Sequence, residues 1–590
     1  MIVGIDVGGT HTDGVLVAQK AADSTADNYK IIATTKVITE QDNLMNSILK
    51  ALDNLIEQSN AKQIERLVLS TTLTTNAILE EKYDPVGLIL IPGPGISSDY
   101  LKYGAENLVL SGYVNHRGQQ VKKIEQSEIK TGLKSFMEKS IKNIAVIGKF
   151  SIRNPEQELA VLAYLKAAEN KFTSLTAGHR LSGRLNFPRR IVTAYFNSAV
   201  TKIHQEFSAA IKQALQKRRL EPELFLLKCD GGTIPLADSL ELPVETVNSG
   251  PAASIMGVMT LSNIDQRQQT AVSLDIGGTT TDIGLFIQGE PVFMPDGIVI
   301  NDLATLIRGL YSISIPIGGD SLIQVIKGEL KIGPRRLGPA AAAGGPAPTP
   351  TDALLVAGYL AEAESYDKKF DLKKAETALS SLVKQLQTAN NSKNILPTAE
   401  KLTVHSLAEL IIDQLTDKIV NRIRKMLADL EDKTVYTISE LLAEVKIEPE
   451  LLLGMGGPAK ALVKLLAQKL NYQAELIPYS KVANAVGAAF ARPTITTTVR
   501  IDTAAGQLDI AEAGIHRSLK ASEKFNLEQS KKLALKITKE RSLVKTAVEI
   551  TDVESFNVIE GFRTVGAIRE IKAQVKPGPI ARLKGDDQDE

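Results

Sequence analysis

Two stretches of the chain share one pattern: Gly4-Ile5-Asp6-Val7-Gly8-Gly9-Thr10-His11-Thr12-Asp13-Gly14-Val15-Leu16-Val17 and Ser273-Leu274-Asp275-Ile276-Gly277-Gly278-Thr279-Thr280-Thr281-Asp282-Ile283-Gly284-Leu285-Phe286. An aspartate, two glycines, two threonines, a second aspartate and a leucine coincide at a constant offset of 269 positions. Each copy reads as a strand, a glycine turn and a second strand, which is typical of a β-hairpin. A repeat of this unit nearly half a chain apart indicates a duplicated domain.

The turn of the first copy has the features of a phosphate-binding loop. Gly8 and Gly9 carry no Cβ, so an oxyanion can approach the backbone N–H groups closely. Thr10 and Thr12 add hydroxyl donors. Asp6 ends a predicted buried strand, where its carboxylate can hold Mg²⁺, an ion that prefers oxygen ligands. A single copy of this turn favours the simpler interpretation of an ordinary hairpin with a solvated aspartate.

The second copy favours a functional interpretation of both turns. It offers the same groups, namely Asp275, Gly277, Gly278, Thr279 and Thr280. Two such hairpins that face each other across a cleft can clamp a triphosphate from both sides. We therefore predict an interdomain site for ATP and Mg²⁺, in which Asp6 and Asp275 are both metal ligands and catalytic residues.

A third glycine-rich turn, Gly454-Met455-Gly456-Gly457-Pro458, lies between a predicted strand and a predicted helix at 459–470. Gly454, Gly456 and Gly457 would let adenine and ribose lie against the backbone. Strand-to-helix turns often contain glycine, so this signal is weak alone and supportive after the two hairpins. The small residues at 483–489 predict a helix that packs closely at an interdomain hinge.

Elsewhere predicted strands alternate with predicted helices, which indicates layered α/β domains. Strands are predicted at 31–37, 66–70, 86–91 and 224–228, and helices at 43–58 and 190–217. After Pro493 the pattern changes to predicted strands and one basic helix. We predict that residues 493–590 form a small α+β subdomain.

Composition narrows the class of protein. The 590 residues are 43% hydrophobic, which is enough for two or three cores, since single cores stop growing near roughly 250–300 residues. Lys+Arg (69) balance Asp+Glu (68), and aromatic residues are only 5%, so neither charge nor stacking favours nucleic acid or an anionic membrane. The single cysteine and the lack of a leader or a long apolar run predict a cytoplasmic protein.

Five residues are candidates for contact with a substrate: Thr75, Asn76, Asn248, Ser249 and Asp320. Those at predicted helix starts can bind an anion or a developing oxyanion through helix N–H groups, although ordinary capping explains them equally well. Asp230 precedes two glycines and is a candidate base or metal ligand, with a turn aspartate as the alternative. His11, within the first turn, is a candidate contact to the γ-phosphate or the substrate.

Eight segments, in this order, resemble the hydantoinase A/5-oxoprolinase family, which includes the β-type subunits of acetone carboxylase. They are 5–13, 71–77, 230–232, 249–252, 274–281, 333–334, 351–353 and 454–458. The resemblance covers about residues 1–492. It implies an ASKHA-type α/β fold, in which duplicated actin-like, ribonuclease H-like domains at 1–190 and 191–492, the second with a helical insertion, enclose a nucleotide cleft.

For function, the resemblance implies ATP-dependent hydrolysis of a cyclic amide (hydantoin, 5-oxoproline or a related lactam) through phosphorylation of the substrate oxygen. It also implies a small-molecule amide or ketone as substrate, with a hydantoinase B-like subunit or a second copy as candidate partners. Other functions remain open: an ATP-binding scaffold, a small-molecule kinase, or a carboxylase subunit that activates a ketone.

The chain departs from the family pattern in three ways. His11 stands where the family usually has phenylalanine, and residues 338–345 replace a Pro-Gly-Pro-x-Cys-Tyr stretch. The chain is also shorter than most members. These departures concern the substrate and the partner subunit, and they leave the two glycine turns intact.

Overall fold

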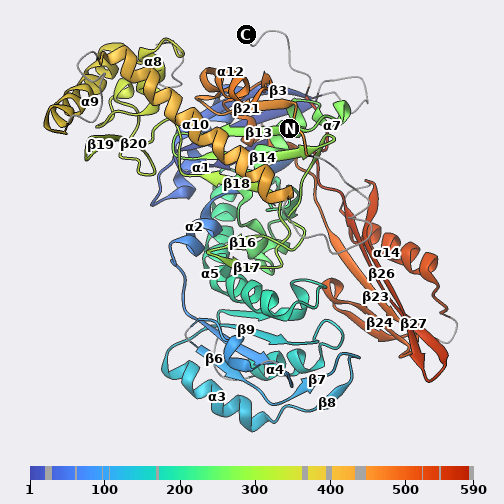
Figure 1. Cartoon of the computed structure of the whole chain (residues 1–590). Coiled ribbons are helices and arrows are strands. Elements are labelled where there is room, and N and C mark those ends of the chain that lie inside the picture. Colours follow the sequence, from blue (N-terminus) through green and yellow to red (C-terminus); the bar gives the residue numbers. More distant parts are fainter. Residues whose placement is uncertain are drawn as a thin grey trace.

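The computed structural model describes residues 1–19, 29–59, 63–95, 97–104, 106–167, 172–361, 370–393, 402–431, 447–520, 523–543 and 546–583. Two mixed sheets lie together in the upper part of Figure 1. A smaller parallel sheet lies below them, beyond the long helix α5 (Phe187–Lys217), and an antiparallel sheet with helix α14 (Leu527–Arg541) extends to one side.

The first mixed sheet is built around the N-terminal hairpin. Its strands, in spatial order, are β12 (Thr233–Pro235), β11 (Glu223–Leu227), β4 (Arg66–Thr71), β1 (Ile2–Val7), β2 (His11–Gln19) and β3 (Tyr29–Ile38). The register places Asp6 opposite Asp13 on β2 and beside Ser70 on β4. Apolar side chains of α1 (Leu44–Ser59) pack on this sheet, as the helical spacing of that segment predicts.

The second mixed sheet repeats this order. Its strands are β15 (Glu290–Pro291), β14 (Thr281–Ile287), β13 (Ala271–Ile276), β21 (Leu451–Met455) and β22 (Gln473–Leu476), and β18 (Ser312–Ile315) pairs with β14. Asp275 lies opposite Asp282, as Asp6 lies opposite Asp13. The series β3-β2-β1-β4-β11 and β18-β14-β13-β21-β22 have the same sequence of antiparallel and parallel pairs. The duplicated α/β fold predicted from the repeat is confirmed.

Two helices of small residues join the sheets: α6 (Ser249–Leu261) and α13 (Ala483–Phe490). Their buried side chains form one cluster with residues of β1, β2, β13 and β21. A Cβ at Gly487 would lie 2.1 Å from the carbonyl oxygen of Ala253, and a Cβ at Gly4 would lie 2.2 Å from that of Ala485. Glycine is therefore required where α13 crosses α6 and β1, and the predicted close packing is confirmed.

An inserted unit separates α2 (Leu73–Leu79) from α5. Its parallel sheet has the order β10 (Ser174–Ala177), β9 (Asn143–Gly148), β5 (Val86–Ile91) and β6 (Glu106–Val109), with α3 (Gln126–Glu138) and α4 (Glu156–Ala167). Its hydrophobic cluster includes Phe136 and Leu133 of α3. Strand β7 (Tyr113–Val114) and strand β8 (Gln120–Lys122) form a small hairpin beside it.

The second half carries further helices and short strands. These are α7 (Ile264–Arg267), α8 (Pro350–Val356), α9 (Leu372–Lys393), α10 (Val404–Glu431), α12 (Ala459–Leu470), β16 (Val299–Ile300), β17 (Leu303–Ala304), β19 (Ile323–Ile326) and β20 (Glu329–Ile332). The C-terminal sheet has the order β25 (Ile515–Ser518), β24 (Gln507–Ile510), β23 (Thr496–Asp502), β27 (Arg563–Val575) and β26 (Val548–Glu560). Helix α14 packs on this sheet, so the segment has both helix and strand as predicted.

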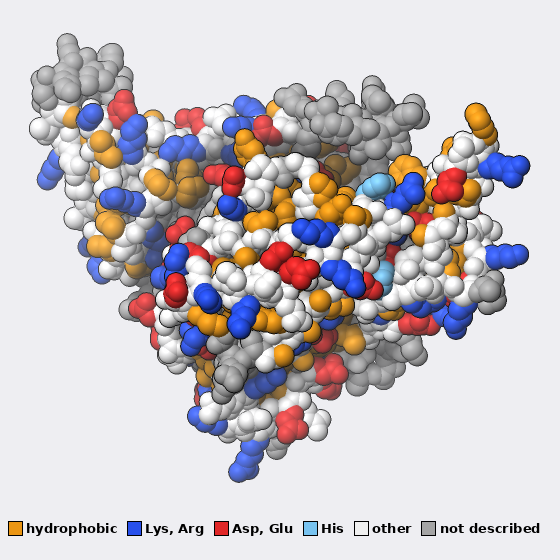
Figure 2. Space-filling model, turned by 90° about the horizontal axis from the view of Figure 1, so that it is seen from below, with side chains coloured by type: hydrophobic (Ala, Val, Ile, Leu, Met, Phe, Trp, Pro, Cys, Tyr) orange, Lys and Arg blue, Asp and Glu red, His pale blue; other side chains and the backbone are white. Residues whose placement is uncertain are grey.

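The face seen in Figure 2 carries both signs of charge. Among the described residues, blue and red side chains are interspersed there, and neither sign forms a continuous field. Of the helices that the structure describes, none has the length and apolar character needed to cross a bilayer.

Replacement of Gly487 by alanine should weaken the whole fold. The added Cβ would meet backbone atoms of α6, which cannot move independently, so we expect a loss of about 1–3 kcal/mol or more in the free energy of unfolding. Chemical denaturation measures this loss. Gly250→Ala is the matched control, because a Cβ at Gly250 meets nothing within 4 Å. Equal stability of the two variants would contradict the close crossing.

Candidate active site

The two glycine turns meet at the centre of the molecule. The Thr10 and Thr279 hydroxyl oxygens lie 3.0 Å apart. Each turn is closed by the same backbone hydrogen bond: Gly8 N–H donates to the His11 carbonyl at 3.0 Å, and Gly277 N–H donates to the Thr280 carbonyl at 2.9 Å. The two predicted loops therefore have one conformation and face each other.

Asn484 of α13 connects the two aspartates that end β1 and β13. Its side-chain N–H₂ donates to Asp275 Oδ2 at 2.8 Å and lies 3.4 Å from Asp6 Oδ2. Ser254 of α6 donates to the same Asp275 oxygen at 2.6 Å. Both helices at the crossing thus hold a polar group against the carboxylates.

Asp6 is held in an environment that opposes its charge. It is 4% exposed, and burial, with Asp13 and Asp275 nearby, raises the pKa of Asp6 to about 7. Its Oδ1 is buried and has no hydrogen-bond partner among the described residues. Burial and the nearby Asp275 also raise the pKa of Asp282 to about 7.

This carboxylate set suits a hard cation, because a buried oxygen without a donor is an available ligand. Nearby positive charge is limited: Lys36 forms an ion pair with Asp13 at 2.6 Å. Within the described residues, no three His, Cys, Asp or Glu side chains form a ready metal-binding group. The metal ligands Asp6 and Asp275 remain a prediction.

His11 and Asp320 lie beside the turns, near Arg336. Asp320 pairs with Arg336 at 3.2 Å, and its backbone N–H donates to the Gly278 carbonyl at 2.7 Å. Burial, with Lys36 and Arg336 nearby, lowers the pKa of His11 to about 4. At neutral pH, His11 is therefore a neutral hydrogen-bonding group, and Asp320 already has a cationic partner.

The three glycines of the third turn have different surroundings. Gly456 has φ +92°, and a Cβ there would lie 2.3 Å from the Ile276 carbonyl and 2.9 Å from Asp275 Oδ1. Gly457 is exposed, and a Cβ there would meet nothing within 4 Å. Gly454 is buried within β21, where a Cβ would strike Val463 of α12. The adenosine role predicted for Gly454 is therefore replaced by strand-to-helix packing.

The predicted phosphate contact by Thr12 is also corrected. Its hydroxyl is buried and lies 2.9 Å from that of Thr39, so it faces β3 and its loop instead of the opposite turn. Thr281, the corresponding residue of the second hairpin, donates to the Ile317 carbonyl at 2.7 Å in the same way. These hydroxyls anchor their hairpins.

Four of the substrate candidates gather beside Asp6. Asn248 N–H donates to the Thr75 hydroxyl at 2.9 Å, and Ser249 Oγ donates to the Thr71 carbonyl at 3.0 Å. Ser70 lies beside Asp6 in the parallel pairing of β1 and β4 and directly precedes Thr71. Asn76 directly follows Thr75 in the first turn of α2, and its backbone N–H donates to the Thr72 carbonyl at 2.8 Å. The starts of α2 and α6 thus form one wall next to the first aspartate.

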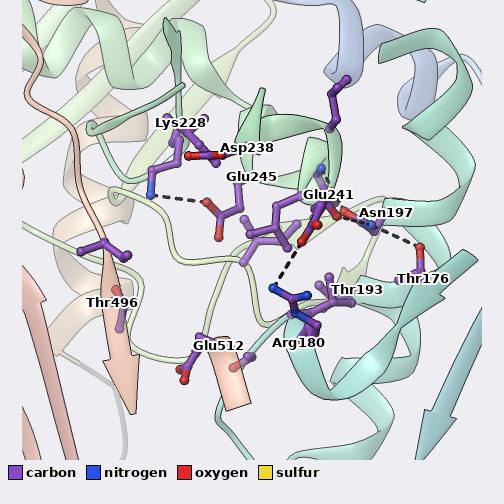
Figure 3. Close-up of a pocket in the computed structure, with 18 of the residues that line it drawn as sticks. Thr176, Arg180, Thr193, Asn197, Lys228, Asp238, Glu241, Glu245, Thr496 and Glu512 are labelled. Atoms are coloured by element: carbon purple, nitrogen blue, oxygen red, sulfur yellow. Dashed lines mark hydrogen bonds and ion pairs between the residues drawn. The ribbon is translucent and has the colours of Figure 1, made fainter. Parts of the chain in front are cut away.

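Asp230 is placed elsewhere. Its carboxylate is buried, lies 3.4 Å from Lys228 Nζ and 4.0 Å from Arg308, and accepts from the Thr494 hydroxyl at 3.3 Å. These positive neighbours lower its pKa. It lines a cavity of about 790 Å³, which Figure 3 shows, whose lining residues include neither turn. This position lies apart from the glycine turns, and the role of Asp230 as a base or metal ligand stays a prediction.

Sequence reasoning missed four members of the site. Asp13 and Asp282 were within the repeat and were passed over in favour of the first aspartate of each hairpin. Asn484 lay in a helix assigned to packing, and Arg336 lay in a loop without periodicity. The repeat of the second aspartate in both hairpins is a sequence signal that could predict Asp13 and Asp282. Asn484 and Arg336 have no such signal.

Comparison with known proteins covers most of the chain. The sequence profile for Hydantoinase/oxoprolinase matches residues 190–497, and that for the Hydantoinase/oxoprolinase N-terminal region matches residues 2–168. The acetophenone carboxylase gamma subunit of Aromatoleum aromaticum is 24% identical over 421 residues, which are 63% of this chain and 55% of that protein. The caprolactamase subunit alpha of Pseudomonas jessenii is 24% identical over 400 residues, 61% and 55% of the two chains.

A solved structure shows the same fold. The crystal structure of the ATP-dependent caprolactamase from Pseudomonas jessenii aligns with a TM-score of 0.67 at 17% identity, over 98% of this chain and 88% of that chain. In sequence, the chain spans about half the length of the curated relatives it matches.

Asp6→Asn should stabilise the protein in a pH-dependent way. The folded-state pKa of Asp6, about 7, lies above its ordinary value of 3.8, so the folded state binds more protons between about pH 4 and pH 7. The free energy of unfolding contributed by Asp6 therefore falls as pH rises through that window. Asparagine does not titrate, so its advantage should grow to a plateau of up to about 4 kcal/mol above pH 7.

Denaturation curves at several pH values measure this difference. Asp302→Asn, at an exposed carboxylate, is the control and should leave the pH profile unchanged. A variant at Asp6 that is less stable than the wild type at pH 8 would contradict the strained environment of that carboxylate.

Proposed function

The chain belongs to the hydantoinase/oxoprolinase family, and from this premise we propose that it uses ATP to open a cyclic amide such as hydantoin, 5-oxoproline or a related lactam. The observation that carries the proposal is the contact of the two glycine turns, with Asn484 between Asp6 and Asp275. Two facing loops of N–H and hydroxyl donors beside buried carboxylates suit a metal-bound triphosphate.

The ATP phosphates would lie between the turns. Of the four glycines predicted to bind phosphate, Gly8 and Gly277 use their N–H groups to close the turns. The N–H groups of Gly9 and Gly278 would approach the phosphate oxygens, and a Cβ at Gly9 would meet nothing within 4 Å. Thr10 and Thr279 would exchange their mutual contact for contacts with the phosphates, so binding separates the turns slightly. Mg²⁺, held by Asp6 and Asp275, would supply positive charge to the phosphate oxygens.

The substrate would lie against the wall formed by Thr75, Asn76, Asn248 and Ser249. This wall adjoins Asp6 through Ser70, so an amide oxygen there can reach the terminal phosphate. Helix N–H groups at the starts of α2 and α6 would stabilise negative charge. Neutral His11 can donate or accept one hydrogen bond without adding charge.

The proposed hydrolysis would consume one ATP and two water molecules. The amide oxygen attacks the γ-phosphorus, the bond from that phosphorus to the ADP oxygen breaks, and an O-phosphorylated amide forms. One water then adds to the activated carbon, and the ring C–N bond breaks to leave an acyl phosphate and an amine. A second water releases inorganic phosphate. The named relatives are subunits, so a hydantoinase B-like partner is a candidate for the hydrolytic steps.

Ketone activation is a second candidate function. The acetophenone carboxylase gamma subunit and the caprolactamase subunit alpha are equally identical to the chain, at 24%. The first step would be the same, because an enolate oxygen replaces the amide oxygen as the acceptor of the phosphoryl group. The product would then pass to a carboxylation step instead of hydrolysis.

A substrate screen tests the proposal. ADP release should rise with one lactam, hydantoin or ketone. Asp6→Ala and Asp275→Ala should each reduce it by about 10²-fold or more, because each removes a proposed ligand of the Mg²⁺ that would offset the phosphate charge. Asp99→Ala, at an exposed carboxylate, should retain the wild-type rate. Unchanged turnover in both site variants would refute the assignment, and ATP binding without stimulated turnover would favour a scaffold.

The third glycine turn gives a second test. Gly457→Ala should fold normally, because its Cβ enters open space, and should bind ATP at least several-fold more weakly if adenosine lies on that backbone. Gly456→Ala should destabilise the protein, because φ is +92° and the Cβ would strike the Ile276 carbonyl. Thermal melts separate the two effects. Wild-type ATP affinity in Gly457→Ala would remove the adenosine role.

A further inference from the structure

The cavity that contains Asp230 lies apart from the glycine turns and carries its own charges. Its wall is assembled from distant parts of the chain: α4, β10 with the turn after it, α5, residues 228–245, residues 306–308, the end of α14, and strands of the C-terminal sheet. Figure 3 shows Thr176, Arg180 and Asn197 on one side and Thr496 and Glu512 on another. A volume of about 790 Å³ is within the range of small-molecule sites.

Lys228 and Arg180 of this wall are each paired with a carboxylate that also lines the cavity. Lys228 Nζ lies 3.4 Å from both Asp230 and Glu245, and Arg180 lies 3.3 Å from Glu241. In Figure 3 the Lys228–Glu245 and Arg180–Glu241 pairs are drawn across the pocket. The charge on this side of the cavity is therefore balanced.

Around Lys572 of β27 the same wall contains a cation that has no such partner among the described residues. Lys572 has no hydrogen bond or ion pair of its side chain among the residues that the structure describes, although it lines the cavity. Arg308 stacks on the Phe293 ring at 4.3 Å. Its buried Nη1 lies 4.0 Å from Asp230 Oδ2 and makes no hydrogen bond within the same described ranges. Arg184 donates to the Pro295 carbonyl and is 3.8 Å from the exposed Asp296.

These three cations influence one another. Burial, with Arg184 and Arg308 nearby, lowers the pKa of Lys572 to about 8. The acidic groups that act on Lys572 are Glu512 and Asp552. Glu512 is held by Thr498, whose hydroxyl donates to it at 2.7 Å, and Asp552 lies opposite Lys572 on β26. Neither carboxylate forms an ion pair with the three cations in the described residues.

We propose that this cavity binds a small oxyanion-bearing molecule, and that Lys572, Arg308 and Arg184 hold its carboxylate or phosphate group. A buried guanidinium N–H without an acceptor and an unpaired ammonium are donors that an oxyanion satisfies. An anion here also relieves the repulsion among the three cations. The site is separate from the glycine turns and does not depend on the function proposed for them.

Calorimetric titration with inorganic phosphate and with succinate at pH 7 tests the site and separates the two sources of oxyanion. We expect one of the two to bind, and Lys572→Gln and Arg308→Gln to weaken that binding by roughly tenfold or more, the loss typical of one charge-assisted hydrogen bond. Lys531→Gln, on the exposed face of α14, is the control and should bind as the wild type does. Binding that persists with excess ATP distinguishes the cavity from the turns.

A second measurement on the wild type does not depend on a variant that folds. At pH 8 the bound anion should raise the pKa of Lys572, so binding should take up a fraction of a proton, measured in buffers of different ionisation enthalpy. Lys572→Arg should bind the anion without this uptake. Three results would each overturn the proposal: no binding of either anion at millimolar concentration, wild-type affinity in Lys572→Gln, or no proton uptake by the wild type.

Discussion

Close contact between backbones is the constraint on which this structure depends. Gly4, Gly257 and Gly487 leave no room for a Cβ where β1, α6 and α13 cross. Because these side chains are absent, α13 lies close enough to both sheets for Asn484 to reach Asp6 and Asp275 together. A larger residue at one of these crossings would move the two carboxylates apart without touching either turn. The geometry of the site therefore depends on three glycines, which have no functional side chain.

The charged carboxylates at the turns destabilise the folded state. Asp6 is buried and Asp282 is partly buried, and both have pKa values raised to about 7. Asp13 and Asp275 lie near Asp6, and Asp275 lies near Asp282. Lys36 offsets only part of this negative charge. Proteins keep such arrangements where function requires them, because any substitution that removes the charge is otherwise favourable. The buried Oδ1 of Asp6, which has no donor among the described residues, is the clearest sign that a ligand completes the site.

The sequence predicts both hairpins, but it does not predict what every side chain in them contacts. The repeat at a fixed offset predicts both turns, because the same glycines require the same local conformation. Periodicity cannot tell which side of a hairpin a hydroxyl faces, so Thr12 was assigned to the cleft although it bonds Thr39. Asn484 and the Asp320–Arg336 pair depend on contacts between distant segments, which leave no local pattern. The cavity around Lys572 is assembled from segments far apart in the sequence and could not be predicted for the same reason.

The two hairpins share a backbone pattern but differ in sequence and in side-chain contacts. Asp13 forms an ion pair with Lys36 at 2.6 Å, whereas its counterpart Asp282 forms no ion pair among the described residues and lies opposite Ser314 on β18. One turn contains His11 where the other contains Thr280. A ligand without twofold symmetry makes different demands on each half, so identical copies would serve it poorly. If the proposed ATP lies between the turns, the differences between the two halves would follow from the end of the ATP that each half faces.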